Sequence, residues 1–160
     1  MPTLIFVCTA NVCRSPMAEA LFVSWLKRNE IPGEWRVGSM GAWAAEGQPA
    51  TDYARQVMAE RGLDLARHRS RIVSEKLLAQ ADLVLCMTRS HREALQAEFA
   101  QYAARIKLFS EIVGQIFDVD DPFGGPRAGY VETAKEMEEL IEQGGGKIVE
   151  LVKQTGSGYA

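Results

Sequence analysis

The sequence predicts an α/β fold, in which one doubly wound domain has a four-stranded parallel sheet with helices on both faces. Strand and helix signals alternate along the chain, as they do in domains with parallel sheets. The runs at 4–8 and 83–87 are short, continuous and apolar, which is typical of strands buried on both faces. No internal repeat or linker divides the 160 residues, so we expect a single domain over residues 1–155 and a flexible tail over 156–160.

The first half of the chain predicts two strands and two helices. The opening apolar run suits a central strand, and Pro16 suits the first turn of the helix that follows it. Thr51 or Asp52 can cap the second helix, and Gly62 can end it. In chain order we expect a strand over 4–8, a helix over 17–29, a strand over 35–39, a loop that includes Gly41 and residues 47–49, and a helix over 52–61.

The second half of the chain continues this alternation. Ser90, with Glu93 three residues later, fits a capping box at the start of a helix. The final helix contains three glycines at 144–146, which predict a weak point. In chain order we expect a helix over 74–81, a strand over 83–87, a helix over 90–99, a strand over 106–109, a turn-rich loop over 118–129 and a helix over 131–152.

The composition is that of an ordinary globular protein, with 47% hydrophobic and 24% charged residues. The net charge of −3 gives no general attraction to nucleic acid or to anionic membranes. The N-terminal segment lacks the basic region of a signal peptide, and no apolar run reaches membrane-spanning length. Three cysteines are an odd number, which argues against a disulfide framework. We therefore expect a cytoplasmic protein with no nucleic-acid partner and no membrane insertion, which is a monomer or else a weak dimer.

One segment between the first strand and the first helix concentrates reactive side chains. Residues 8–16 read Cys-Thr-Ala-Asn-Val-Cys-Arg-Ser-Pro, and Cys8 ends the predicted strand. A loop of this kind binds anions, because the unpaired N–H groups at a helix N-terminus carry partial positive charge. Ligands of doubly wound sheets bind beyond the carboxyl ends of the strands, which is where Cys8 lies. The segment therefore predicts a thiolate that attacks a bound oxyanion.

The side chains of this loop suit phosphoryl transfer. The Arg14 guanidinium is a planar donor that matches two phosphoryl oxygens, and its charge favours the thiolate form of Cys8. The Ser15 hydroxyl can donate a hydrogen bond to the sulfur. Asn11 tolerates the left-handed backbone conformation that turns N–H groups inward. Attack by Cys8 would form a phosphocysteine, which water then hydrolyses.

The leaving group also needs a proton donor, which the loop lacks. Residues 118–126 read Asp-Val-Asp-Asp-Pro-Phe-Gly-Gly-Pro and follow the fourth predicted strand, so they should return to the same edge of the sheet. Asp121 is the candidate general acid, because Pro122 stiffens it and Phe123 could wall the substrate. The same carboxylate could deprotonate the water of the second step. Asp118 and Asp120 are expected to be solvated loop charges.

The loop from Cys8 to Pro16, followed far downstream by Asp121 and Pro122, resembles the low-molecular-weight protein phosphatase family over essentially the whole chain. The resemblance implies a Rossmann-like phosphatase I fold, no metal or cofactor, and phosphorylated protein side chains as substrates. It also implies that Cys8 is the nucleophile, that Arg14 binds phosphate and that Asp121 is the general acid. The phosphate-binding loop would comprise Thr9, Ala10, Asn11, Val12, Cys13, Arg14 and Ser15.

The resemblance further implies roles for residues around the nucleophile. Asn11 would hold the loop with help from Ser39 and His68, and Ser15 would activate the nucleophile. Cys13 resembles the neighbouring thiol that forms a reversible disulfide with the nucleophile in many members. The substrate rim would consist of Val12, Trp43 and Phe123.

Two positions in the loop bear on the substrate. Most members have glycine where this chain has Ala10. The acid loop, Asp-Pro-Phe-Gly-Gly, resembles the bacterial protein arginine phosphatase branch, which has threonine at the position of Val12, whereas the tyrosine-specific branch usually has isoleucine. Because Val12 is apolar and Trp43 could stack on a ring, we expect a protein-tyrosine-phosphatase. A phosphoarginine hydrolase that uses the same residues is the alternative.

Other features have simpler explanations or suggest other functions. Cys86 lies inside an apolar strand and is expected in the core, whereas His91 is expected on a helix surface. The run Gly-Gly-Gly-Lys at 144–147 lacks the spacing and the Ser or Thr of a nucleotide-binding loop. A thioredoxin-coupled arsenate reductase is only a remote alternative. That enzyme needs a pair of further cysteines near the third strand, and this sequence has only Cys86 there. A catalytically silent phosphopeptide binder is a third possibility.

Overall fold

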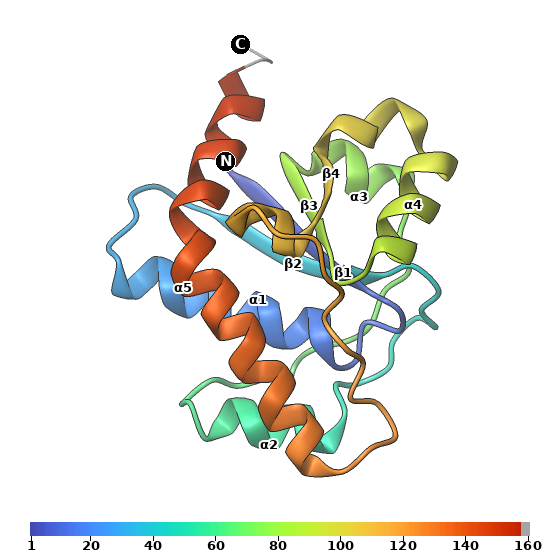
Figure 1. Ribbon diagram of the computed structural model, residues 1–160, viewed down its shortest axis with the longest axis vertical. Coiled ribbons are helices and arrows are strands. Elements are labelled where there is room, and N and C mark those ends of the chain that lie inside the picture. Colours follow the sequence, from blue (N-terminus) through green and yellow to red (C-terminus); the bar gives the residue numbers. More distant parts are fainter. Residues whose placement is uncertain (158–160) are drawn as a thin grey trace.

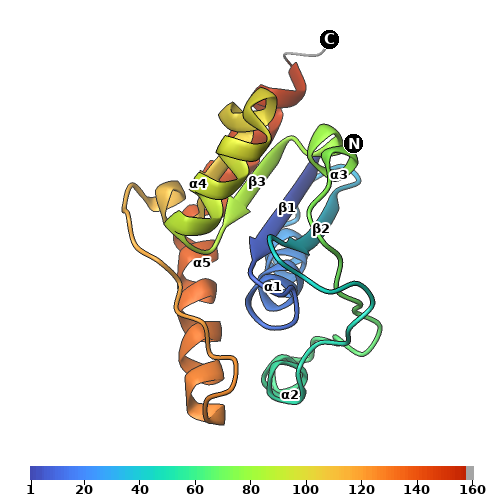
Figure 2. The ribbon, with the colours of Figure 1, turned by 90° about the vertical axis from the view of Figure 1, so that its right-hand side faces the viewer.

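The structure of the protein, a computed structural model, describes residues 1–157 and contains a four-stranded sheet within them. All neighbouring strands are parallel and follow the order β2-β1-β3-β4, which confirms the predicted α/β fold. Figure 2 shows β1, β2 and β3 running side by side in one direction. The strands are β1 (Thr3–Cys8), β2 (Arg36–Gly41), β3 (Leu83–Cys86) and β4 (Ile106–Leu108).

Helices cover both faces of the sheet, because alternate side chains of the central strand point to opposite faces. Phe6 packs with residues of α1 and α5 on one face, and Val7 packs with residues of α3 and α4 on the other. Figure 1 shows α1 and α5 to one side of the sheet and α3 and α4 to the other. No helix within residues 1–157 is long and apolar enough to cross a membrane. The helices are α1 (Arg14–Arg28), α2 (Asp52–Ala59), α3 (Glu75–Gln80), α4 (Arg89–Glu98) and α5 (Arg127–Ser157), with 3-10 turns η1 (Ala100–Arg105) and η2 (Phe109–Val113).

Helices α1, α4 and α5 begin at other residues than predicted. Helix α1 begins at Arg14 rather than at residue 17, so the loop after β1 is short and Arg14 belongs to the helix. Helix α4 is capped by Thr88, whose hydroxyl accepts from the His91 N–H, because Thr88 follows β3 closely. The predicted cap, Ser90, is instead a helical residue. Helix α5 begins at Arg127 and extends through Ser157, so residues 156 and 157 of the predicted tail are helical. Residues 158–160 of that predicted tail lie outside the described residues.

The three glycines at 144–146 do not interrupt α5. A Cβ atom at Gly145 would lie 2.4 Å from Cζ2 of Trp25, and one at Gly144 would lie 2.5 Å from Cδ1 of Ile112. Glycine at these two positions therefore lets α5 approach α1 and η2 closely. Gly146 faces open space and has no such neighbour. Since α1 begins in the loop after β1, this packing also positions that loop.

All three cysteines are unpaired thiols. Cys86 is fully buried in β3, among apolar residues of the face covered by α3 and α4. Burial raises the pKa of the Cys86 thiol well above its ordinary value. This cysteine is a core residue, as predicted.

Candidate active site

The loop between β1 and α1 folds tightly around the sulfur of Cys8. Asn11 adopts the left-handed conformation, with φ of 59°, and is fully buried. Its backbone N–H points back to the Cys8 Sγ at 3.3 Å. Ala10 is outside the left-handed region, so its methyl group imposes no backbone strain where most relatives are expected to have glycine. The observed geometry thus matches the inward turn expected from the asparagine.

Strand β2 holds the other side of this loop. The N–H of Ala42 donates to the Cys8 carbonyl at 2.9 Å, and that of Trp43 donates to the Thr9 carbonyl at 3.0 Å. A Cβ atom at Gly41 would lie 2.6 Å from the same Thr9 carbonyl oxygen. The end of β2 must therefore be glycine for the loop to pack this closely.

A buried network of hydrogen bonds determines the direction of the contact between Ser15 and Cys8. Ser39 Oγ donates to the Glu19 carboxylate at 2.7 Å, because a carboxylate only accepts. The Asn11 amide nitrogen then donates to both serine oxygens, at 2.9 Å to Ser39 and 2.8 Å to Ser15. The one proton of Ser15 is left for the Cys8 Sγ, 3.0 Å away. The network makes Ser15 a donor to the sulfur, the arrangement that stabilises a thiolate.

Glu19 was not among the sequence-predicted site residues. Burial raises its pKa, while the Ser39 hydrogen bond and the nearby Arg71 oppose this effect. The sequence did contain a signal, since residues four apart on a helix share a face and Glu19 follows Ser15 by four positions.

His68 and Arg71 bind the outer side of Asn11. His68 Nε2 lies 2.6 Å from the Asn11 carbonyl oxygen, and the Arg71 N–H donates to the Asn11 side-chain oxygen at 3.0 Å. Burial lowers the pKa of His68, and the neighbouring arginines lower it further, although the Asn11 carbonyl opposes them. Because a carbonyl oxygen only accepts, the Nε2–H of His68 donates to Asn11. The structure thus brings Ser39 and His68 to Asn11, the two residues expected to support it.

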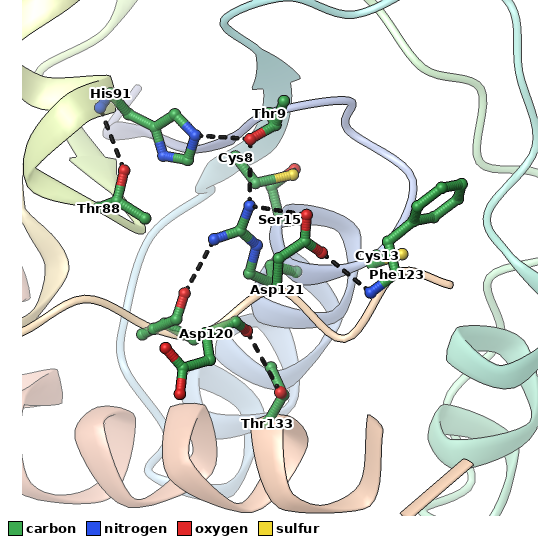
Figure 3. Close-up of polar contacts among 12 residues, drawn as sticks. Cys8, Thr9, Cys13, Ser15, Thr88, His91, Asp120, Asp121, Phe123 and Thr133 are labelled. Carbon is green, nitrogen blue, oxygen red and sulfur yellow. Dashed lines mark hydrogen bonds and ion pairs between the residues drawn. The ribbon is translucent and has the colours of Figure 1, made fainter. Parts of the chain in front are cut away.

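Arg14 and Asp121 meet beside Cys8, although they lie far apart in the sequence. Arg14 Nη2 is 3.4 Å from Asp121 Oδ2 and donates to Thr9 Oγ1 at 3.2 Å. Its Nη1 donates to the Val119 carbonyl at 2.8 Å. The Arg14 side chain is 3% exposed, whereas that of Asp121 is 45% exposed, so the carboxylate remains accessible. Figure 3 shows Asp121 directed toward the loop that carries Cys8.

The segment that carries Asp121 is a turn whose side chains stabilise its own shape. Asp121 Oδ1 accepts from the Phe123 N–H at 3.1 Å, which is an Asx-type turn. Asp118 accepts from the Arg89 N–H at 2.9 Å at the start of α4, so it is not simply the solvated loop charge that was predicted. Asp120 is exposed, and its backbone carbonyl accepts from Thr133.

The residues expected at the substrate rim differ in their exposure. Trp43 is 59% exposed and Phe123 is 63% exposed. Val12 is half-buried and packs against the core on the α1 side of the sheet, and its carbonyl accepts from the Thr51 N–H at 3.0 Å. The loop therefore presents a partly exposed apolar side chain at position 12.

Cys13, the residue before α1, is buried beside two hydroxyl groups. Its Sγ is 3.5 Å from Thr51 Oγ1 and 3.4 Å from the Tyr130 hydroxyl. Burial raises the pKa of this thiol, although its two hydroxyl partners oppose the effect. The disulfide that the resemblance implies between Cys13 and Cys8 stays a prediction.

The prediction that His91 lies on a helix surface is wrong. His91 is 2% exposed, and its Nε2 lies 2.8 Å from Thr9 Oγ1. The prediction failed because α4 packs its first turn against the loop after β1, which the sequence pattern alone does not reveal. Within residues 1–157, no cluster of His, Cys, Asp and Glu side chains is arranged to hold a metal ion.

Comparisons with known proteins agree with this geometry. Residues 3–154 match the sequence model of the family described as low molecular weight phosphotyrosine protein phosphatase. A protein-arginine-phosphatase of Bacillus subtilis is 41% identical over 88% of this chain and 92% of its own length. A probable low molecular weight protein-tyrosine-phosphatase of Ralstonia solanacearum is 36% identical over 76% of this chain and 78% of its own. The crystal structure of a low molecular weight protein tyrosine phosphatase from T. tengcongensis superimposes with a TM-score of 0.84, at 40% identity, over 89% of this chain and 97% of that one.

Proposed function

This chain belongs to the low molecular weight phosphotyrosine protein phosphatase family, and we propose that it hydrolyses phosphorylated protein side chains with Cys8 as nucleophile, Arg14 as phosphate binder and Asp121 as general acid and base. The observation that carries these assignments is the meeting of Arg14 with Asp121 beside the Cys8–Ser15 contact. In addition, Arg14 Nε is buried and has no partner among the described residues. Buried donors are rarely left unpaired, so this guanidinium fits a site for an oxyanion.

In the first step, the Cys8 thiolate attacks phosphorus and forms an S–P bond while the bond to the leaving oxygen or nitrogen breaks. Arg14 and the N–H groups of the loop balance the charge on the phosphoryl oxygens. A bound phosphoryl group also replaces the Asp121 carboxylate as the partner of Arg14 Nη2. Asp121 is then free to carry the proton that the leaving group takes up.

In the second step, the Asp121 carboxylate accepts a proton from water. The water oxygen attacks phosphorus, the S–P bond breaks, and the Cys8 thiolate returns with inorganic phosphate as product. The Ser15 proton, which the Asn11 network directs at the sulfur, stabilises the leaving thiolate. One side chain thus serves as acid and then as base in a single cycle.

We propose phosphotyrosine as the substrate. Val12 offers no hydrogen-bonding group to a guanidinium, and the exposed rings of Trp43 and Phe123 suit an aromatic side chain. Phosphoarginine is the second candidate, because the relative at 41% identity bears the name of an arginine phosphatase. Overall identity does not separate the two, since a relative named for tyrosine is 40% identical.

Two assays test the proposal. Release of phosphate from p-nitrophenyl phosphate should be lost in Cys8→Ser, and equal rates for the two proteins would refute the assigned chemistry. Turnover of phosphotyrosine and phosphoarginine peptides should then be compared for wild type, Val12→Thr and Val12→Ile. We expect Val12→Thr to move the preference toward phosphoarginine and Val12→Ile to move it toward phosphotyrosine. No change in either variant would show that Val12 does not select the substrate.

The free thiols of all three cysteines are consistent with a reducing compartment. We therefore include a cytoplasmic location in the proposal, with phosphorylated proteins as partners and a monomer as the working form.

A further inference from the structure

Two linked hydrogen bonds reach the candidate phosphate site from one face of the sheet, and the hydrogen bonds of Asn11 with Ser15 and Ser39 reach it from the other. His91, in the first turn of α4, contacts Thr9 Oγ1, and Thr9 Oγ1 accepts from Arg14 Nη2. Figure 3 shows the imidazole of His91 pointing at the Thr9 hydroxyl, beside Cys8. The mechanism above assigns no role to the side chain of His91 or to that of Thr9.

The protonation state of His91 follows from its surroundings. Burial, together with the positive charge of Arg14, lowers the pKa of His91 to about 4, against the opposite effect of Asp118 and Asp121. The ring is therefore neutral near pH 7. Its other face packs near Trp43, with the two ring centroids 5.8 Å apart.

The tautomer of His91 follows from its second nitrogen. Nδ1 is buried and has no hydrogen-bond partner among the described residues. A buried N–H without an acceptor is rarer in proteins than a buried acceptor without a donor. The proton is accordingly on Nε2, and this N–H donates to Thr9 Oγ1.

Thr9 Oγ1 then accepts two hydrogen bonds, one from His91 Nε2 and one from Arg14 Nη2. A hydroxyl has two lone pairs and one proton, so both lone pairs are used. The proton of Thr9 has no acceptor among the described residues and lies next to the guanidinium that would bind the phosphoryl group.

We propose that the Thr9 hydroxyl donates a hydrogen bond to a phosphoryl oxygen and that His91, as the neutral Nε2–H tautomer, is the positioning residue that directs it there. This inference rests on the proposed function, because it places the phosphoryl group on Arg14. It adds a hydroxyl to the donors that the proposed mechanism places on the phosphoryl oxygens, which are otherwise Arg14 and the backbone N–H groups of the loop. The substrate part that Thr9 recognises is the phosphoryl group, which phosphotyrosine and phosphoarginine share.

The test measures inhibition of p-nitrophenyl phosphate hydrolysis by inorganic phosphate, together with kcat and KM. Thr9→Val should weaken phosphate binding by about tenfold to a hundredfold, the usual effect of losing one hydrogen bond to a charged group. Thr9→Ser should stay within about threefold of wild type, since it keeps the hydroxyl. Equal binding of phosphate by wild type and Thr9→Val would overturn the role of Thr9.

A matched pair of variants tests His91. The amide nitrogen of Gln reaches about where Nε2 lies, whereas that of Asn reaches about where Nδ1 lies. His91→Gln should therefore keep most of the phosphate affinity, and His91→Asn should lose about as much as Thr9→Val. The double variant Thr9→Val/His91→Asn should be no worse than Thr9→Val, because the two residues act on one hydrogen bond. Additive losses would overturn the positioning role.

The imidazole nitrogens also give a readout that does not depend on activity. In ¹⁵N-labelled protein at pH 7, the His91 ring should show the Nε2–H tautomer, and an Nδ1–H pattern would contradict the assignment. The proposed function can fail separately: in that case wild type and Cys8→Ser hydrolyse p-nitrophenyl phosphate equally. If Cys8→Ser is inactive and Thr9→Val binds phosphate normally, only the inference about Thr9 and His91 fails.

Discussion

Replacing Gly145 with alanine should expose how tightly α5 packs on the helix that carries the active-site loop. The new Cβ would lie 2.4 Å from Cζ2, 2.5 Å from Cε2 and 2.8 Å from Cη2 of Trp25, whereas carbon atoms in contact prefer about 3.5–4.0 Å. Trp25 has little freedom to move, because it is 6% exposed and stacks on Phe22 with ring centroids 5.6 Å apart. Overpacking of this kind costs about 1–3 kcal/mol.

A neighbouring glycine provides the control. Gly146→Ala adds a methyl group with nothing within 4 Å, and both substitutions gain the same helix preference of alanine, about 1 kcal/mol. Gly146→Ala should therefore stabilise the protein by up to about 1 kcal/mol. The free energy of unfolding of Gly145→Ala should lie about 1–3 kcal/mol below that of Gly146→Ala, because the helix preference cancels between them.

Urea unfolding followed by circular dichroism would measure both free energies, and thermal midpoints should differ by about 2–4 °C per kcal/mol. If Gly145→Ala is as stable as Gly146→Ala, the close contact between α5 and Trp25 does not exist as described. Phosphatase activity of Gly145→Ala below its unfolding transition would show whether a shift of α1 reaches the loop.

Three further predictions concern the site. The pKa of His91 falls from 6.5 to about 4 on folding, so His91 takes up its proton in the unfolded chain first as the pH falls. The stability that neutral His91 contributes is therefore complete above pH 6.5 and is lost toward pH 4. Wild type should lose up to about 3 kcal/mol more than His91→Gln in urea unfolding between pH 6.5 and 4.5, and parallel losses would contradict the shift. Asp121→Asn should lower kcat by about 10²–10⁴-fold. The loss should be greater for phenyl phosphate than for p-nitrophenyl phosphate, because the better leaving group of p-nitrophenyl phosphate needs less protonation. An equal loss of kcat for both substrates would argue against an acid role for Asp121. Ser39→Ala removes the acceptor of the Asn11 amide nitrogen and the donor to the Glu19 carboxylate. It should therefore lower the free energy of unfolding by about 1–3 kcal/mol in urea unfolding, and it should lower kcat in the turnover assay.

Much of the fold was predictable because its signals are local. The apolar runs that became β1 and β3 differ from the observed strands by one residue at one end. Helix starts were less predictable, since Thr88 and Ser90 are both good caps and only the position of β3 decides between them. The glycines of α5 were expected to weaken it, but Gly145 makes room for Trp25 and Gly144 makes room for Ile112, and no local pattern reveals these contacts.

The chemistry of the loop depends on spacing along the chain, and the sequence by itself determined it. Cys8, Asn11, Arg14 and Ser15 are close because the turn between a strand and a helix is short, whatever surrounds it. The residue types predicted the contact between Ser15 and Cys8 and the inward turn at Asn11. The hydrogen bond from the Asn11 amide to Ser15 was not predicted.

Tertiary structure alone decided which distant side chains complete the site. Ser39 reaches Asn11 because the parallel register pairs it with Phe6, two residues before the end of β1. His91 reaches Thr9 because α4 packs beside the loop, although a histidine in a polar stretch has the pattern of a surface residue. The burial of these side chains and the directions of their hydrogen bonds depend on how several elements pack together. The sequence could therefore name the nucleophile and its acid, and the family resemblance named Ser39 and His68. The roles of Glu19 and His91 in the network became visible only in the fold.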